Sequence, residues 1–151
     1  MRILTIELLG SGDLVAMAQC IAIDAEAFPY ASAQFGMRYA SSRVWVAREG
    51  LDAPVAGFLA ARVRRELLHV EGVAVDPGVR RRGLGRALVR EMVEHARALR
   101  LRAVQLHVSV TNGAAIALYE AEGFVIRRRL ADFYPRSAFG ETHALEMMRL
   151  F

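Results

Sequence analysis

The sequence predicts a mixed α/β fold, with one sheet of about six to seven strands and about four helices. The chain has 151 residues, the usual length of one domain, so we expect a single domain over residues 1–151. Hydrophobic residues make up 54% of the chain and charged residues 24%, a balance typical of a globular protein. In the middle of the chain a predicted helix lies between two predicted strands, which places part of the sheet in parallel pairing.

The first half of the chain is expected to supply most of the strands. Alternating or β-branched residues predict these strands, and turn residues over 49–54 predict a hairpin. Apolar residues at helical spacing after Asp13, a candidate N-cap, predict the longer helix, which Phe28-Pro29 ends. The expected elements are, in order, a strand over 2–9, helices over 13–27 and 32–39, and strands over 43–48, 55–64 and 67–75.

The second half is expected to alternate helices and strands. Leu84, Leu88, Met92 and Leu99 form one apolar stripe at helical spacing. Gly123 is placed to end the following helix. The expected elements are a helix over 84–99, a strand over 103–110, a helix over 112–121, and closing strands over 124–133 and 144–150.

Composition excludes several classes of protein. All 20 basic residues are arginines, and a Walker P-loop, a kinase, a Schiff-base enzyme and a pyridoxal-phosphate enzyme each need a lysine. Cys20 is the only cysteine, which leaves no internal disulfide or Cys-rich zinc site, and we expect a small buried hydrophobe there and no metal. No signal-like segment and no run of roughly 20 apolar residues is present, so we expect a cytoplasmic protein without membrane contact.

The most informative segment, residues 73–86, runs from a strand through a turn into a glycine-rich helix start. Gly83 and Gly85 let the backbone approach a ligand closely. Amides of the first helical turn lack helical partners and, with the helix dipole, bind anions such as a pyrophosphate. Four arginines add positive charge there: Arg80, Arg81, Arg82 and Arg86. A glycine-rich corner beside a solvated arginine run would give the same pattern.

Two motifs in order resemble those of the GNAT acetyltransferase superfamily. Arg80-x-x-Gly83-x-Gly85, after the strand at 73–75, resembles the acetyl-CoA signature Q/R-x-x-G-x-G/A. Residues 112–124 resemble the family's N-x-x-A-I-x-L-Y-x-x-x-G-F. Residues 26–30 and Phe133-Tyr134-Pro135 further resemble the RimI type, the bacterial ribosomal-protein alanine N-acetyltransferases, so the resemblance spans nearly the whole chain.

The resemblance implies a GNAT fold, in which the central parallel strands splay to admit the pantetheine arm of acetyl-CoA. It implies transfer of an acetyl group from acetyl-CoA, the co-substrate, to a primary amine, with the Val75 N–H polarising the thioester. The implied cofactor-binding residues are Val73, Ala74, Val75, Arg80, Arg81, Arg82, Gly83, Leu84, Gly85, Arg86, Asn112 and Tyr119. The implied acceptor-facing residues are Phe28, Tyr30, Phe133 and Tyr134.

Catalytic roles follow from the same resemblance. Tyr119 matches the family's general acid toward the departing thiolate, although a core aromatic would fit that position too. Asn112 can contact CoA, cap its helix, or do both. His107 stands where the relatives carry a Glu in an L-E-V segment; an imidazole with a pKa near 6.5 can accept a proton at neutral pH, while a half-exposed strand histidine fits equally. Glu71 and His69 are alternative bases acting through water.

The acceptor is the least constrained feature. Thr142-His143-Ala144 replaces the E-D-A of the relatives beside the acceptor entrance, which weakens the case for a ribosomal protein. The leading hypothesis is an enzyme that acetylates the N-terminal α-amino group of a protein or peptide. The alternatives are acetylation of a small amine (an amino acid, polyamine or antibiotic), a non-catalytic acyl-CoA sensor, and a basic nucleic-acid-binding domain using arginines at 80–82 and 127–129. The sequence fits a monomer or a dimer.

Overall fold

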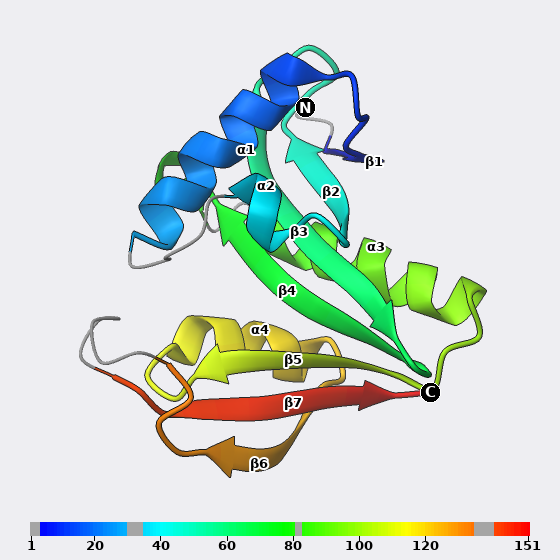
Figure 1. The fold of residues 1–151 in the computed structure, drawn as a ribbon, viewed down its shortest axis with the longest axis vertical. Coiled ribbons are helices and arrows are strands. Elements are labelled where there is room, and N and C mark those ends of the chain that lie inside the picture. The colour runs from blue at the N-terminus through cyan, green and yellow to red at the C-terminus, as the bar shows by residue number, and fades with distance from the viewer. Residues whose placement is uncertain (1–3, 30–34, 81–82, 135–140) are drawn as a thin grey trace. The chain divides into compact units, whose positions relative to one another are not determined.

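The computed structural model describes residues 4–29, 35–80, 83–134 and 141–151. It confirms the mixed α/β class: seven strands hydrogen bond in the order β1-β2-β3-β4-β5-β7-β6, and four α-helices lie among the described residues. The elements are β1 Thr5–Leu8, α1 Leu14–Ala27, α2 Phe35–Arg38, β2 Arg43–Arg48, β3 Val55–Arg64, β4 Leu67–Val75, the short 3-10 turn η1 Pro77–Val79, α3 Leu84–Ala98, β5 Ala103–Ser109, α4 Gly113–Ala121, β6 Val125–Leu130 and β7 Ala144–Leu150 (Figure 1).

Each expected element is present, and the differences lie at element ends. The first strand covers only Thr5–Leu8 of the expected residues 2–9, of which 2 and 3 lie outside the described residues. Helix α2 is a single turn, and Ser32, the expected start of that helix, also lies outside them. Strand β6 ends at Leu130 rather than at 133 because the chain turns at Asp132, whose φ of 51° is left-handed, a region that Asp tolerates better than most residues.

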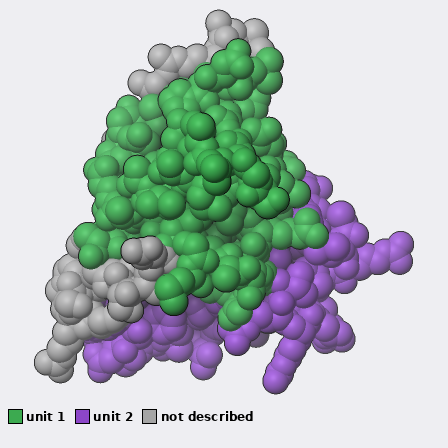
Figure 2. Space-filling view, turned by 45° about the horizontal axis from the view of Figure 1, so that its top comes forward, with its two compact units in different colours: residues 1–62, 71–92 green, residues 63–70, 93–151 purple. Residues whose placement is uncertain are grey.

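Contacts within the chain define two compact units, coloured separately in Figure 2. Unit 1 comprises residues 1–62 and 71–92, and unit 2 comprises residues 63–70 and 93–151.

Unit 1 has an aromatic core. Phe35, Tyr39 and Phe58 meet edge to face, with ring centroids 4.9, 5.1 and 5.8 Å apart. The Tyr39 hydroxyl accepts a hydrogen bond from Arg38 Nη2 at 2.9 Å and donates to Asp24 Oδ1 at 3.5 Å. Cys20 is fully buried in this core, and burial raises the pKa of its thiol to about 11. The expectation of a buried hydrophobe at Cys20 is therefore confirmed.

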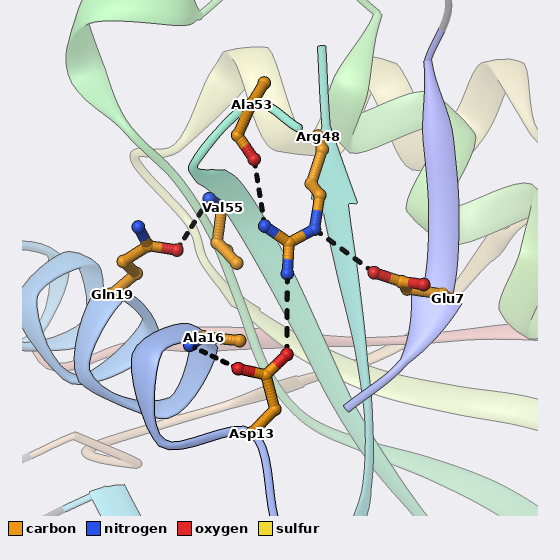
Figure 3. A network of polar contacts seen from close by, with 7 residues as sticks. All are labelled: Glu7, Asp13, Ala16, Gln19, Arg48, Ala53 and Val55. Carbon is orange, nitrogen blue, oxygen red and sulfur yellow. Dashed lines mark hydrogen bonds and ion pairs between the residues drawn. The ribbon is translucent and has the colours of Figure 1, made fainter. Parts of the chain in front are cut away.

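One arginine joins three segments of unit 1 (Figure 3). From the end of β2, Arg48 Nε donates to Glu7 Oε1 in β1 at 3.1 Å, and Nη1 donates to the Ala53 carbonyl in the β2–β3 turn at 2.9 Å. Its Nη2 lies 3.8 Å from Asp13, whose carboxylate caps α1 by accepting from Ala16 N at 3.0 Å. The predicted N-cap at Asp13 is thus confirmed, and its second oxygen is held by Arg48.

Unit 2 is built on strand pairing. Residues 67–69 of β4 pair in parallel with residues 103–105 of β5, as the strand–helix–strand order predicts. Strand β7 pairs antiparallel with β5 and with β6, so the last two strands of the chain are exchanged in space relative to their order in sequence. Alternation along β5 and β7 buries Val104, Leu106 and Met147 on one face and directs Gln105, His107 and Glu146 to the other.

Candidate active site

The start of α3, in unit 1, has the geometry of an anion cradle. The Ala87 N–H donates to the Gly83 carbonyl at 3.0 Å, so the amides of residues 84–86 precede the first hydrogen bond of the helix. Gly83 adopts a φ of +83°, which favours glycine, and a Cβ placed there would meet no described atom within 4 Å. The backbone at Gly83 therefore borders open space, as a phosphate-binding turn requires.

At the end of β4, the backbone N–H and C=O groups alternate between the edge that faces β3 and the opposite edge. Asp76 N donates to the Ala56 carbonyl of β3 at 2.8 Å, and a Cβ added to Gly57 of β3 would lie 3.0 Å from the Ala74 carbonyl oxygen. Because successive residues of a strand direct their polar groups to opposite edges, the N–H and C=O of Val75 point away from β3. The structure thus directs the Val75 N–H to the edge where a thioester donor is expected.

Two of the four arginines expected near the cradle, Arg80 and Arg86, lie among the described residues. Arg80 is exposed, and its Nε donates to the Val75 carbonyl at 3.3 Å, while Arg86 is exposed on α3. Arg81 and Arg82 lie outside the described residues. Leu84 is buried with 1% of its surface exposed, so its side chain anchors the helix and only its backbone can serve a ligand.

A polar cluster lies on the face of the unit 2 sheet that carries His107. The imidazole lies beside His69 of β4 and Phe133 after β6, with ring centroids 5.4 and 4.6 Å away. His69 Nδ1 lies 3.1 Å from Gln105 Oε1, a hydrogen-bond distance. The structure therefore brings together two of the three candidate bases and one acceptor-facing aromatic.

Glu146 belongs to this cluster and was not identified from sequence. It pairs with His107 across the β5–β7 ladder, and Gln105 Nε2 and Arg128 Nε each donate to one of its carboxylate oxygens. Burial alone would raise the pKa of Glu146, but the hydrogen bonds from Arg128 and Gln105 and the charges of Arg128 and His107 lower it overall. Glu146 is thus an ionised carboxylate with 6% of its surface exposed. The sequence feature that could have identified Glu146 is its position as the one acidic residue in the otherwise apolar first half of β7.

Helix α4 holds the remaining two candidates. Asn112 caps it by accepting from Ala115 N at 3.2 Å, so the capping role is observed. Tyr119 is buried beside Phe124, with ring centroids 5.7 Å apart, and burial raises the pKa of its hydroxyl to about 12. The hydroxyl therefore stays protonated throughout the neutral range.

The other candidates are spread over both units. In unit 1, Glu71 forms an ion pair with Arg62, with 2.6 Å between Oε1 and Nε, and Phe28 is half-buried against the core below the Arg38 guanidinium. In unit 2, Phe133 is exposed and meets Tyr134 edge to face at 5.0 Å. Tyr30 lies outside the described residues.

The segment that replaces the relatives' E-D-A is held by Asp132. Thr142 Oγ1 donates to Asp132 Oδ1 at 2.9 Å, and the Asp132 N–H donates to His143 Nδ1 at 3.1 Å. The His143 N–H donates to Glu141 Oε1 at 2.9 Å. Two carboxylates, Asp132 and Glu141, therefore flank this segment although its own acidic pair is missing.

These features define a member of an acyltransferase family. The family model described as the acetyltransferase (GNAT) family matches residues 11–124, and the chain belongs to that family. It is therefore an N-acetyltransferase with acetyl-CoA as its donor.

Known relatives carry the resemblance further. The chain is 35% identical over 150 residues to the [ribosomal protein bS18]-alanine N-acetyltransferase of Salmonella typhimurium, covering 95% of each chain. The crystal structure of the corresponding Escherichia coli enzyme superposes with a TM-score of 0.81 at 28% identity, covering 98% of this chain and 94% of that one. The streptothricin acetyltransferase of Streptomyces lavendulae is 34% identical over 110 residues, covering 72% of this chain and 58% of that protein. These findings confirm the similarity to the RimI type.

None of the described helices is long and apolar enough to cross a membrane. No cluster of three metal-ligating His, Cys, Asp or Glu side chains occurs in the part of the chain that the structure describes.

Proposed function

We propose that this acetyltransferase modifies the N-terminal α-amino group of a protein or peptide. The observation that carries the proposal is the cluster around His107, where an imidazole lies 4.6 Å from the exposed ring of Phe133, beside Tyr134. Exposed aromatic side chains suit packing against a peptide. The similarity to the bS18-alanine enzyme over 95% of both chains supports the same class of acceptor.

His107 serves as the general base in this proposal. An α-amino group has a pKa near 8, so it arrives mostly protonated at neutral pH and must lose a proton before it attacks the thioester. An imidazole has an ordinary pKa near 6.5, close enough to neutral pH for it to accept this proton. Glu71 is less suited because Arg62 already holds its carboxylate.

The acetyl donor is held by unit 1 in the proposal. The backbone of residues 73–75 binds the pantetheine arm, with the Val75 N–H directed at the thioester carbonyl, and the amides of residues 84–86 bind the pyrophosphate. Arg80, Arg81, Arg82 and Arg86 add positive charge around it, with Arg80 in place at the strand end. The proposal also assigns donor contacts to Asn112 and Tyr119 of α4, as the family motif implies, with the Tyr119 hydroxyl donating to the departing thiolate.

A small amine is the second candidate acceptor. The similarity to streptothricin acetyltransferase over 72% of this chain favours it. A panel of peptides with free N-termini and of small amines, assayed for CoA release, decides between the two. We expect higher kcat/KM with a peptide, and a preference for an antibiotic or polyamine would overturn the choice of acceptor.

Donor binding is tested separately by thermal unfolding. Acetyl-CoA should raise the melting temperature in a dose-dependent way because it binds only the folded protein. Gly85→Glu should abolish the rise by adding bulk and negative charge at the pyrophosphate site. Gly10→Glu is the matched control, because it adds the same side chain at an exposed loop position with no described atom within 4 Å of a new Cβ. A normal response in Gly85→Glu would contradict the placement of the cradle.

A further inference from the structure

We propose that Glu146 is a positioning residue for His107, acting on its imidazole as a fixed negative charge that favours the protonated form. The proposal rests on the proposed function, in which His107 is the base.

The register of the sheet places the two residues together. His107 and Glu146 are direct partners in the antiparallel β5–β7 ladder. Directly opposite residues have Cβ atoms about 4.5–5.5 Å apart and project from the same face. A carboxylate is therefore built into the sheet next to the residue that stands where the relatives carry a glutamate.

The carboxylate is fixed in orientation by its neighbours. Gln105 and Arg128 each donate to one oxygen, and Gln105 also lies within hydrogen-bond distance of His69. This chain of contacts runs across four strands, from β4 through β5 and β7 to β6. With His69 and Phe133 beside it, the His107 ring has neighbours on either side and a fixed negative charge across the ladder.

Stability alone does not account for a charge at this position. Burying a carboxylate is unfavourable unless it is paired, and an apolar residue of similar volume is often as stabilising as a buried ion pair. Its partner Arg128 is 65% exposed, so solvent screens part of their attraction. A buried carboxylate beside a candidate base is more readily explained by its effect on that base.

The sign of the effect follows from the charges around His107. Glu146 of β7 favours the imidazolium, whereas Arg128 of β6 and a protonated His69 of β4 oppose it. Asp132 and His143, beyond the ends of β6 and β7, bond to each other next to Phe133. A unit charge 5–6 Å away at an effective dielectric constant near 20 shifts a pKa by up to about two units, and Arg128 offsets part of that, so we expect about one unit.

The test is an NMR titration of the imidazoles in the protein without donor or acceptor, with His107→Asn used to assign the signal. Glu146→Gln keeps the shape and removes the charge, and should lower the midpoint of His107 by about one pH unit. Arg128→Gln should raise it, because the carboxylate then acts unopposed. Glu66→Gln is the matched control: it removes a carboxylate that pairs with Arg102 on the exposed surface of the same unit, and should change nothing. The acidic limb of kcat/KM should move with the NMR midpoint in each variant.

The outcomes separate this inference from the proposed function. Unchanged His107 midpoints in Glu146→Gln and Arg128→Gln would overturn the role of Glu146, whatever the activity. If Glu146→Gln fails to fold, Glu146→Asp decides, because it draws the same charge back by one methylene and should lower the His107 midpoint by a smaller amount; an unchanged midpoint contradicts the proposal. Midpoints that shift as expected while the acidic limb of kcat/KM stays in place would leave the Glu146–His107 interaction standing and overturn His107 as the base.

Discussion

Removal of the Tyr119 hydroxyl offers a quantitative test of the thiolate end of the reaction. Tyr119→Phe keeps the buried ring and its contact with Phe124 and deletes one oxygen. We expect kcat to fall and the affinity for acetyl-CoA to change little, because the lost contact matters mainly in the transition state.

The magnitude follows from the pKa of the hydroxyl. Burial raises the pKa of Tyr119 to about 12. A thiol has a pKa of about 8.5, so complete proton transfer from Tyr119 to the thiolate would be uphill by about 5 kcal/mol. The hydroxyl is better suited to donate a hydrogen bond than to give up its proton. A hydrogen bond to a charged group contributes about 1.5–3 kcal/mol, which predicts a loss of about 10- to 150-fold in kcat.

Stopped-flow or steady-state CoA release measures this loss, with the melting temperature as a check on folding. Tyr39→Phe is the matched stability control, because its hydroxyl bonds to Arg38 and Asp24; it should lower the melting temperature more than Tyr119→Phe does. The wild type should also show no alkaline limb from Tyr119 below about pH 11, since its pKa is about 12. A Tyr119→Phe enzyme within twofold of wild-type kcat would refute the assignment.

Four further outcomes are expected. His107→Ala should lose most activity and His107→Glu should keep it, with the acidic limb of kcat/KM moved to lower pH, toward the ordinary value of a carboxylate; an active Ala variant with an unshifted profile would reject His107 as the base. Gly57→Ala places a Cβ 3.0 Å from the Ala74 carbonyl, so the melting temperature should fall by several degrees and donor binding should weaken, whereas Gly36→Ala, with open space at its Cβ, should not destabilise. The lowered pKa of Glu146 stabilises the fold above its ordinary value of 4.5, and this stabilisation is lost as the pH falls below it; Glu146→Gln should unfold with a flatter dependence on acid. Cys20 should react with a thiol reagent only on unfolding, because it is buried with a pKa of about 11.

Local sequence signals predicted the elements of the fold well. The cap at Asp13 and the strand–helix–strand order depend on neighbouring residues, and the structure confirms both. Of the predicted apolar stripe, Leu84, Leu88 and Met92 are buried on α3, but Leu99 lies beyond the end of that helix and is exposed. The exchange of β6 and β7 in the sheet was not predictable in this way, because pairing between distant strands depends on tertiary packing.

In the polar cluster around His107, too, contacts between strands could not be predicted from local sequence. His107 was identifiable because it departs from a motif, but Glu146 becomes informative only through the register that places it opposite His107. Gly57 was missed for a similar reason: its importance lies in the approach of the Ala74 carbonyl from another strand, which no property of its own neighbours reveals. Sequence patterns within one strand therefore do not predict residues whose role depends on contacts with another strand.

The Arg48 junction has a consequence for how unit 1 opens. A single guanidinium holds the first strand through Glu7, the β2–β3 turn through Ala53 and the cap of α1 through Asp13. The first strand has only four residues and lies at the edge of the sheet, so its amides would ordinarily exchange with solvent independently of the helix. Because all three segments bond to one side chain, their amides should exchange as one cooperative group. Arg48→Lys should let the three segments exchange at separate rates, because an ammonium lacks the planar set of N–H donors with which the guanidinium reaches three partners.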